Sequence, residues 1–336
     1  MESTLSYLMR RMLWVPPVLF AVTFATFALA RLGPGDPVRI AAGQFRDPEA
    51  FERVRIARGL DKPVYEQYYI YMKGVLTEGD FGESFRYRDL SVNEILFPAM
   101  WRSAQYGFVA LVLMVSAGVP LGIYAARKQG KWQDPATISA FLFFQSIPSL
   151  VMLPFLALFF SLKLGIFPAR GWPQPQDCNV SLGFLPQSYQ CIGVISIEAV
   201  IPIIALTLPA IAVWARFTRA FTLDVMREDY VRTAQSKGIS EYRVLTRHVL
   251  RNSLLPLTTM IAFALTGLVE GAFFVETLTG IPGAGRLAIE SVSSRDYDMI
   301  MAFTIVTATL FVVMSIVIDI AYTFIDPRIR YGSRRN

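Results

Sequence analysis

Long apolar runs separated by short charged segments are the dominant pattern of this chain. Six runs have about the 20 residues that a helix needs to cross the hydrocarbon core of a bilayer. None alternates apolar and polar residues as a membrane strand does, so the sequence predicts an all-α, polytopic protein with six transmembrane helices. The predicted spans are residues 12–30, 106–126, 135–162, 199–215, 253–275 and 299–318.

The charged residues predict which way these helices face. If both termini are cytoplasmic, the inner segments carry 17 Lys and Arg against 7 Asp and Glu, and the rest of the chain carries 15 against 19. Basic residues collect on the cytoplasmic side of a membrane, so we expect both termini to be cytoplasmic. The net charge of +6 is then a sign of topology and does not indicate binding to nucleic acid. The inner segments are 1–11, 127–134, 216–252 and 326–336.

This topology divides the chain into four parts. We expect a cytoplasmic N-terminus with the first span (1–31), an extracytoplasmic helical excursion (32–101), a core of five transmembrane helices (102–325) and a cytoplasmic tail (326–336). Both cysteines, Cys178 and Cys191, fall in a second outer segment, 163–198. Because that side of the membrane is oxidising, a disulfide between them is one interpretation, and two free thiols are the other.

Motifs for catalysis or cofactor binding are missing. No Gly-x-x-x-x-Gly-Lys-Ser/Thr sequence occurs, so an ATPase motor would have to lie in another chain. The single histidine, His248, rules out histidine-based triads and metal sites. The glycine-rich segment 283–288 fits a dinucleotide fingerprint, but it falls in an outer loop without the strand and helix that give the fingerprint meaning. We therefore expect neither an enzyme nor a bound cofactor.

Ionisable residues near the spans are the candidates for a solvated path. Glu270 and Glu276 are the candidate pathway-lining residues, whereas Asp319 lies near the cytoplasmic boundary and fits an interfacial anchor. So few groups make a poor proton relay. This weakens one interpretation of the chain, in which it is an ion-coupled secondary transporter or a channel acting alone.

The inner segment 216–252 predicts a protruding element. Glu228 and Asp229 suit the start of a helix, Gly238 suits its end, and a second helix follows with an apolar stripe at Tyr242, Leu245 and Val249. We call this helix–glycine–helix element, residues 228–249, the knob. It could dock a soluble partner or lie on anionic lipid, and the residues alone leave both interpretations open.

A series of short motifs follows the whole chain in a fixed order. They are Arg31-Leu32-Gly33-Pro34-Gly35-Asp36-Pro37, Gly79-Asp80-Phe81-Gly82-Glu83-Ser84, Ser146-Ile147-Pro148-Ser149, Asp229-Tyr230-Val231-Arg232-Thr233-Ala234 with Lys237-Gly238, Val275-Glu276-Thr277, Pro282-Gly283-Ala284-Gly285-Arg286 and Asp326-Pro327-Arg328-Ile329-Arg330. In this order and spacing the chain resembles the first permease subunit of dipeptide and oligopeptide ABC importers.

The resemblance implies a type I ABC importer permease fold in a bacterial or archaeal cytoplasmic (inner) membrane. It also implies a second homologous permease, one or two kinds of P-loop ATPase that hold ATP and Mg, an extracytoplasmic solute-binding protein and a peptide or related solute. By the same resemblance, the ATPase-docking and coupling residues are Glu228, Asp229, Tyr230, Arg232, Thr233, Ala234, Lys237 and Gly238. The identity of the solute stays open at this point.

Overall fold

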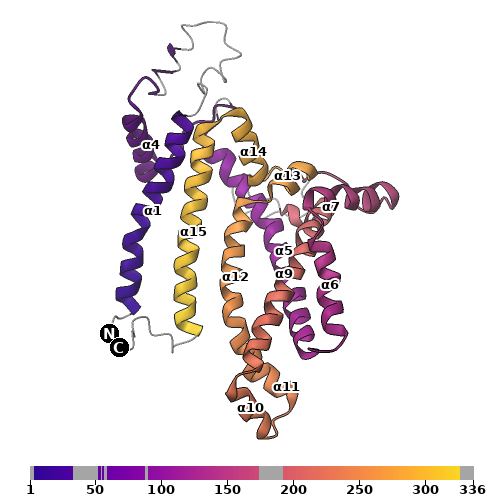
Figure 1. Ribbon diagram of the computed structural model, residues 1–336. Coiled ribbons are helices and arrows are strands. Elements are labelled where there is room, and N and C mark those ends of the chain that lie inside the picture. Colours follow the sequence, from indigo (N-terminus) through magenta and orange to yellow (C-terminus); the bar gives the residue numbers. More distant parts are fainter. Residues whose placement is uncertain are drawn as a thin grey trace.

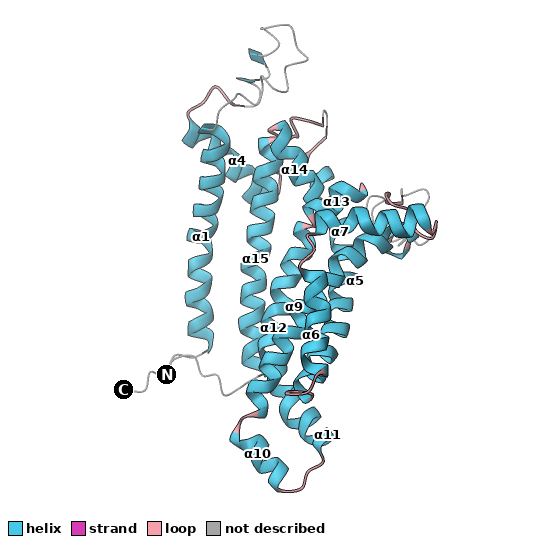
Figure 2. Ribbon diagram, turned by 45° about the vertical axis from the view of Figure 1, so that its right-hand side comes forward, coloured by secondary structure: helices cyan, strands magenta, loops and turns pink. Residues whose placement is uncertain are grey.

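The computed structural model describes residues 4–32, 52–53, 55–56, 59–87, 90–173 and 192–325. Within these ranges the named elements are all helical (Figure 2). The longer helices are α1 (Thr4–Leu32), α4 (Val64–Glu78), α5 (Val92–Arg127), α6 (Gln133–Gln145), α9 (Val200–Met226), α12 (Leu250–Glu270), α14 (Ala284–Ser294) and α15 (Tyr297–Ile325). The shorter ones are α7 (Ser149–Leu156), η2 (Ala157–Lys163), η4 (Gly193–Ile195), η5 (Ile197–Ala199), α10 (Asp229–Ser236), α11 (Glu241–Arg243), η6 (Val244–Val249) and α13 (Phe273–Thr279).

Four stretches of the described chain are long and apolar enough to cross a membrane as single helices. They are Met9–Ala30, Val92–Arg127, Ile197–Met226 and Tyr297–Ile320. Two further candidates are helix pairs, Gln133–Gln145 with Ser149–Lys163 and Glu241–Leu254 with Pro256–Glu270, bent by 89° and 48°. Counting each pair as one span gives up to six spans by length and composition.

The predicted span 135–162 is divided in two by Pro148. The proline has φ −57° and ψ 142°, outside the helical region, and its ring disfavours helical geometry at the residue before it. As a result α6 ends at Gln145, and α7 with η2 runs at 89° to it and extends sideways from the bundle (Figure 1). The 13 residues of α6 extend only about 20 Å, which is short of a full crossing on their own.

The centre of the bundle is the contact between α5 and α9. A Cβ atom added at Gly122 of α5 would lie 2.5 Å from the Ala215 carbonyl oxygen and 2.6 Å from Thr218 Cβ. Only glycine permits so close an approach, as at the small-residue contacts common between membrane helices. On the neighbouring face, Leu111, Trp214 and Leu257 form a buried cluster that joins α12 to this pair.

One edge of the bundle consists of α1, α4 and α15 (Figures 1 and 2). Asp319 of α15 forms an ion pair with Arg11 of α1, so this carboxylate joins two spans. Tyr68 of α4 packs its ring against three phenylalanines of α1, and its hydroxyl lies 2.7 Å from Thr23 Oγ1. Helix α4, which belongs to the predicted outer segment, therefore packs against the C-terminal half of α1.

Candidate functional site: the knob and the buried outer carboxylate

The knob projects beyond the bundle at one end. In Figures 1 and 2, α10 and α11 lie past the ends of α5, α6 and α12, on the same side as the first turn of α1 and the last turn of α15. The chain enters the knob directly from α9, which ends at Met226, and leaves it through η6 into α12. The knob is thus connected without a long linker to two helices of the bundle.

A small apolar core holds the knob together. Val231 and Ala234 of α10 and Val244 and Val249 of η6 are all buried, with Val231 at 0% exposure. Val225, Met226, Ile239 and Leu245 are partly buried around them. Packing of this kind makes the two helical pieces move as one body with the end of α9.

The predicted stripe of Tyr242, Leu245 and Val249 is wrong at its first position. Tyr242 is 72% exposed, and Val244 takes its place in the core beside Val249. The cause is the widened helical geometry from Val244 to Val249, in which residues five apart share a face. A stripe spaced for an ordinary helix therefore selects the wrong side chain here.

Most of the predicted docking residues are on the surface of the knob. Seven of the eight are exposed, and their backbone or side chains face solvent: Glu228, Asp229, Tyr230, Arg232, Thr233, Lys237 and Gly238. Ala234 lies in the core of the knob instead. Gly238 has φ 72°, the left-handed geometry that ends α10 and turns the chain toward α11.

A hydrogen bond and an ion pair also join the knob to the bundle. Asn252 Nδ2 of α12 donates a hydrogen bond of 2.7 Å to the Tyr230 hydroxyl. Arg127, the last residue of α5, forms an ion pair of 3.1 Å with Glu241 of α11. The pair is exposed, so we expect it to orient the knob more than to stabilise it.

At the opposite end of the bundle, the Glu276 carboxylate of α13 is completely buried. Its Oε1 accepts hydrogen bonds from Ser103 Oγ at 2.7 Å, from the Tyr106 hydroxyl and from the Ala272 N–H at 3.3 Å. Its Oε2 accepts one from the Arg286 N–H at 2.8 Å. The carboxylate therefore ties α5, the end of α12 and α14 together, and we call it the outer hub.

The glycine-rich segment 283–288 contributes to the outer hub. Gly283 is the N-cap of α14, and the rest of the segment forms the first turns of that helix. In the described part of the chain no strand precedes it, so the context of a dinucleotide fingerprint is missing. A Cβ atom at Gly283 would lie 2.5 Å from Glu276 Cδ, so the backbone comes too close to the carboxyl group for any side chain. Glycine at position 283 therefore allows the backbone to lie close to the Glu276 carboxyl group. Burial raises the pKa of the Glu276 carboxyl, although its four donors act in the opposite direction.

A cavity of about 260 Å³ lies beside the outer hub, between α5, α9 and α12. Ser103 and Tyr106 line it together with small residues such as Ala110, Ala264 and Gly267. Glu276 itself is enclosed behind these side chains, and Glu270 at the end of α12 is half buried. Whether either glutamate lines the solute path stays a prediction.

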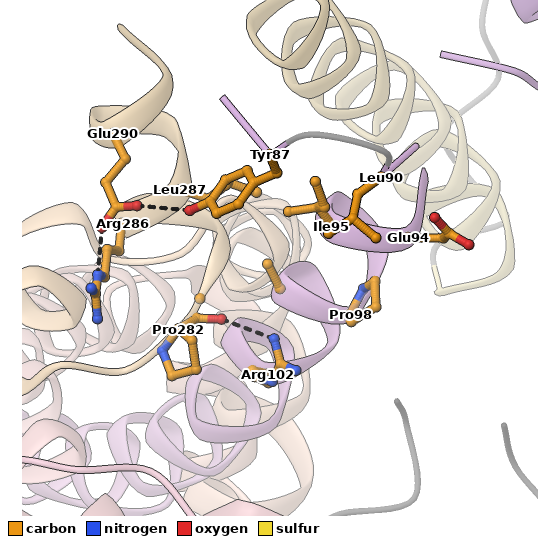
Figure 3. A pocket seen from close by; sticks show the side chains of 12 residues that line it. Tyr87, Leu90, Glu94, Ile95, Pro98, Arg102, Pro282, Arg286, Leu287 and Glu290 are labelled. Atoms are coloured by element: carbon orange, nitrogen blue, oxygen red, sulfur yellow. Dashed lines mark hydrogen bonds and ion pairs between the residues drawn. The ribbon is translucent and has the colours of Figure 1, made fainter. Parts of the chain in front are cut away.

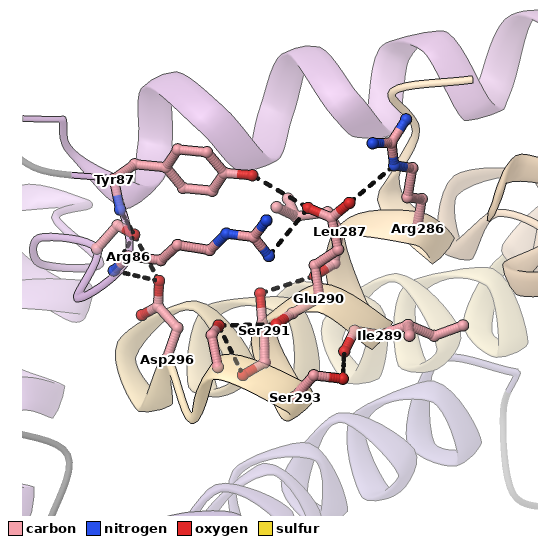
Figure 4. Close-up of polar contacts among 11 residues, drawn as sticks. Arg86, Tyr87, Arg286, Leu287, Ile289, Glu290, Ser291, Ser293 and Asp296 are labelled. Carbon is pink, nitrogen blue, oxygen red and sulfur yellow. Dashed lines mark hydrogen bonds and ion pairs between the residues drawn. The ribbon is translucent and has the colours of Figure 1, made fainter. Parts of the chain in front are cut away.

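A second hollow of about 340 Å³ opens between α14 and the start of α5 (Figure 3). Glu290 is its central charged group: it accepts from Arg286 Nε at 2.8 Å, from the Tyr87 hydroxyl at 3.1 Å and pairs with Arg86 at 3.1 Å (Figure 4). Burial raises the pKa of Glu290, but the Arg286 hydrogen bond and the two guanidinium charges outweigh it and lower the pKa overall. Ser84 Oγ donates to Asp296 Oδ2 at 2.5 Å, just beyond the end of α14. Together these contacts fasten residues 84–87 of the outer segment to α14 and the residues that follow it.

Sequence reasoning missed the partners of Glu276. Ser103 and Tyr106 precede it by about 170 residues, so no local pattern links them to it. Their spacing of three was the available indication, because it puts two polar groups on one face of an otherwise apolar helix. Cys178 and Cys191 lie outside the described residues.

The comparisons with known proteins identify the family. A family model described as "Binding-protein-dependent transport system inner membrane component" matches residues 118–331, and the model of its N-terminal region matches residues 4–87. The chain belongs to this family of inner membrane transport components. It is therefore a permease subunit of an ABC importer and a multi-pass membrane protein, and the alternative of a self-contained transporter or channel is not supported.

Similar proteins match along nearly their full length. The chain is 33% identical to the oligopeptide transport system permease protein OppB of Haemophilus influenzae, with 97% of this chain and 100% of that protein covered. It is 33% identical to the dipeptide transport system permease protein DppB of Alkalihalophilus pseudofirmus, again with 97% and 100% covered. It is 34% identical to the glutathione transport system permease protein GsiC of Shigella flexneri, with 97% and 99% covered. The predicted resemblance to the peptide-importer permeases is confirmed.

A solved structure of the MetNI methionine ABC transporter, in an inward-facing conformation, resembles this chain with a TM-score of 0.51. It is 14% identical and covers 69% of this chain and 97% of the solved one. A likeness at this identity concerns the fold alone. It agrees with the predicted type I ABC importer permease fold.

Proposed function

We propose that this chain is one of two permease subunits of an ATP-driven importer for peptides or related small solutes. The relatives named for oligopeptide, dipeptide and glutathione transport support this class of solute. The partner subunits are a second, homologous permease, one or two kinds of P-loop ATPase and an extracytoplasmic solute-binding protein. ATP and Mg bind to the ATPases, and this chain has no ATPase site of its own.

The observation that carries the proposal is the knob. A body with a dry apolar core and a polar, exposed outer face is built to contact a protein in water rather than lipid hydrocarbon. It continues directly from α9 and into α12, which both belong to the bundle. Because no long linker separates them, a displacement of the knob would therefore displace α9 and α12 as well. On this proposal the knob and both termini are cytoplasmic.

The mechanism that follows is alternating access. Closure of the two ATPases on ATP draws their docked knobs together and favours the outward-facing arrangement of the two permeases. The binding protein then delivers its solute at the outer end, near the Glu276 hub. Hydrolysis of ATP releases the knobs and returns the permeases to the inward-facing arrangement. The ligand can shift the equilibrium only by its difference in affinity for the two arrangements.

The test replaces the surface of the knob in the complete importer. Changing Asp229 and Arg232 together to alanine leaves the core of the knob intact, since both side chains are largely exposed, 98% and 68%. We expect weaker association with the ATPases, or ATP hydrolysis without uptake. A matched control is Ser116→Ala, which alters an exposed hydroxyl of α5 that bonds to the Leu113 carbonyl within the same helix. Uptake and stimulated hydrolysis at the wild-type level in the double variant would refute the docking role.

A further inference from the structure

A bidentate ion pair joins α6 to α9 near the cytoplasmic end proposed for the bundle. Arg219 Nε lies 2.5 Å from Asp134 Oδ1, and Arg219 Nη2 lies 2.6 Å from Asp134 Oδ2. The Asp134 side chain is 8% exposed and that of Arg219 is 29% exposed. Two parallel charge-assisted bonds in a largely enclosed place fix both distance and orientation, which an exposed pair such as Arg127–Glu241 does not.

The pair lies on the route from the knob into the membrane. Arg219 is on α9 only two helical turns before Met226, where the helix ends and the knob begins. Val225 and Met226, in the last turn, pack against the core of the knob. Movement of the knob must therefore move the stretch of α9 that carries Arg219.

Asp134 connects Arg219 of α9 to helix α6. It lies in the first turn of α6, where a negative charge also complements the helix dipole. Helices α5 and α9 lie in close contact nearby, at Gly122 of α5. A Cβ atom added at Gly122 would lie 3.0 Å from the backbone nitrogen of Arg219. Helix α6 packs along α9, and at this end the ion pair adds a contact that fixes the distance and orientation of the two helices.

We propose that Asp134 and Arg219 are positioning residues that transmit the movement of the knob from α9 to α6, and through α6 to α7. This inference rests on the proposed function, because it requires an ATPase docked on the knob. The pair acts at a distance from the docking surface and from the outer hub. We call it the latch.

The test uses the complete importer in lipid vesicles and measures the ATP hydrolysed per solute imported. Asp134→Asn removes the charge and keeps the shape, while Arg219→Lys keeps the charge and removes the planar fork that makes the pair bidentate. Lys131→Gln is the matched control, since it removes an exposed charge three residues from Asp134. The amount of assembled complex is measured for each variant, so that a folding defect is seen separately.

We expect both latch variants to assemble and to raise the ATP hydrolysed per solute by at least about fivefold, the lower end of typical coupling between sites. The control should leave the ratio unchanged. Exchanging the two residues, Asp134→Arg with Arg219→Asp, should bring the ratio back toward the wild-type value, which a purely structural defect would not do. If Asp134→Asn does not assemble, Arg219→Lys and the exchange decide in the same way.

An unchanged ratio in assembled Arg219→Lys or Asp134→Asn complexes would overturn the latch and leave the proposed function standing. A wild-type complex that imports solute without ATP, or that contains no ATPase, would overturn both. The two failures are therefore distinguishable in a single set of vesicles.

Discussion

Replacing Glu276 should destabilise the outer end of the protein by an amount that depends on how many of its four donors lose their acceptor. In Glu276→Gln, the amide oxygen can take the place of Oε1 and keep the hydrogen bonds from Ser103, Tyr106 and Ala272. The amide nitrogen then faces the Arg286 N–H, which donates to Oε2 in the native protein. One buried donor is left without an acceptor. In Glu276→Ala three are, because the Ala272 N–H still donates to the Tyr106 hydroxyl at 3.1 Å.

The magnitudes follow from the cost of a buried unsatisfied donor, about 1–3 kcal/mol. Glu276→Gln should lose about that amount, and Glu276→Ala should lose about 4 kcal/mol or more, since three unsatisfied donors and a cavity remain. For a chain of this size, 1 kcal/mol corresponds to roughly 2 °C in the unfolding midpoint. The expected decreases are therefore about 2–6 °C for glutamine and about 8 °C or more for alanine.

The assay is the midpoint of thermal loss of the monodisperse complex in detergent. Glu270→Gln is the matched control: its carboxylate is half buried at the same end of the bundle, and it accepts no hydrogen bond within the described part of the chain. We expect the control to shift the midpoint by no more than about 1 °C. Equal midpoints for the glutamine and alanine variants, or a wild-type midpoint for Glu276→Gln, would refute the counting of donors on which the outer hub rests.

Two further predictions concern the packing of α5 and the outer segment. Gly122→Ala should lower the same thermal midpoint, at a cost of about 1–3 kcal/mol for overpacking against α9, whereas Gly267→Ala, with open space around its Cβ, should not. Equal effects of the two would contradict the close contact. Because the pKa of Glu290 is lowered, its contribution to stability is present above the ordinary value of 4.5 and is lost as the pH falls through the lowered one. Hydrogen exchange of residues 84–87, corrected for its intrinsic rate, should therefore increase at that acidic end and not between pH 8 and pH 6. Glu290→Gln should reduce this pH dependence, with the remainder left to Asp296, which accepts from Ser84 and the Arg86 N–H. An undiminished pH dependence in this variant would contradict the assignment.

The parts of the fold that depend on local pattern could be predicted from the sequence. The apolar runs located the long helices, because a helix in lipid must bury its backbone and present apolar side chains. The helix Asp229–Ser236 and its end at Gly238 follow from charge at the first turn and from the left-handed geometry that glycine adopts. The motif series then located the family without any tertiary information.

The parts that depend on contacts between distant residues could not be predicted in this way. Asp134 and Arg219 are 85 residues apart, and Ser103 and Glu276 are 173 apart. A charge at the edge of an apolar run looks like an interfacial anchor until its partner is known, as Asp319 also illustrates. The division of the third run is different. Pro148 was visible in the sequence, but proline is common in membrane helices, so its presence alone did not distinguish a kink from the end of a helix.

The most direct test of the central claim is a photo-cross-linking side chain placed at position 229 in the complete importer, in intact membranes. The account predicts a cross-link from this position on the knob to a P-loop ATPase. It predicts none to that ATPase from position 65 on α4, where the native tyrosine is 74% exposed at the other end of the bundle. Cross-linking of position 229 to lipid or to a second copy of this chain, with no ATPase recovered, would contradict the account.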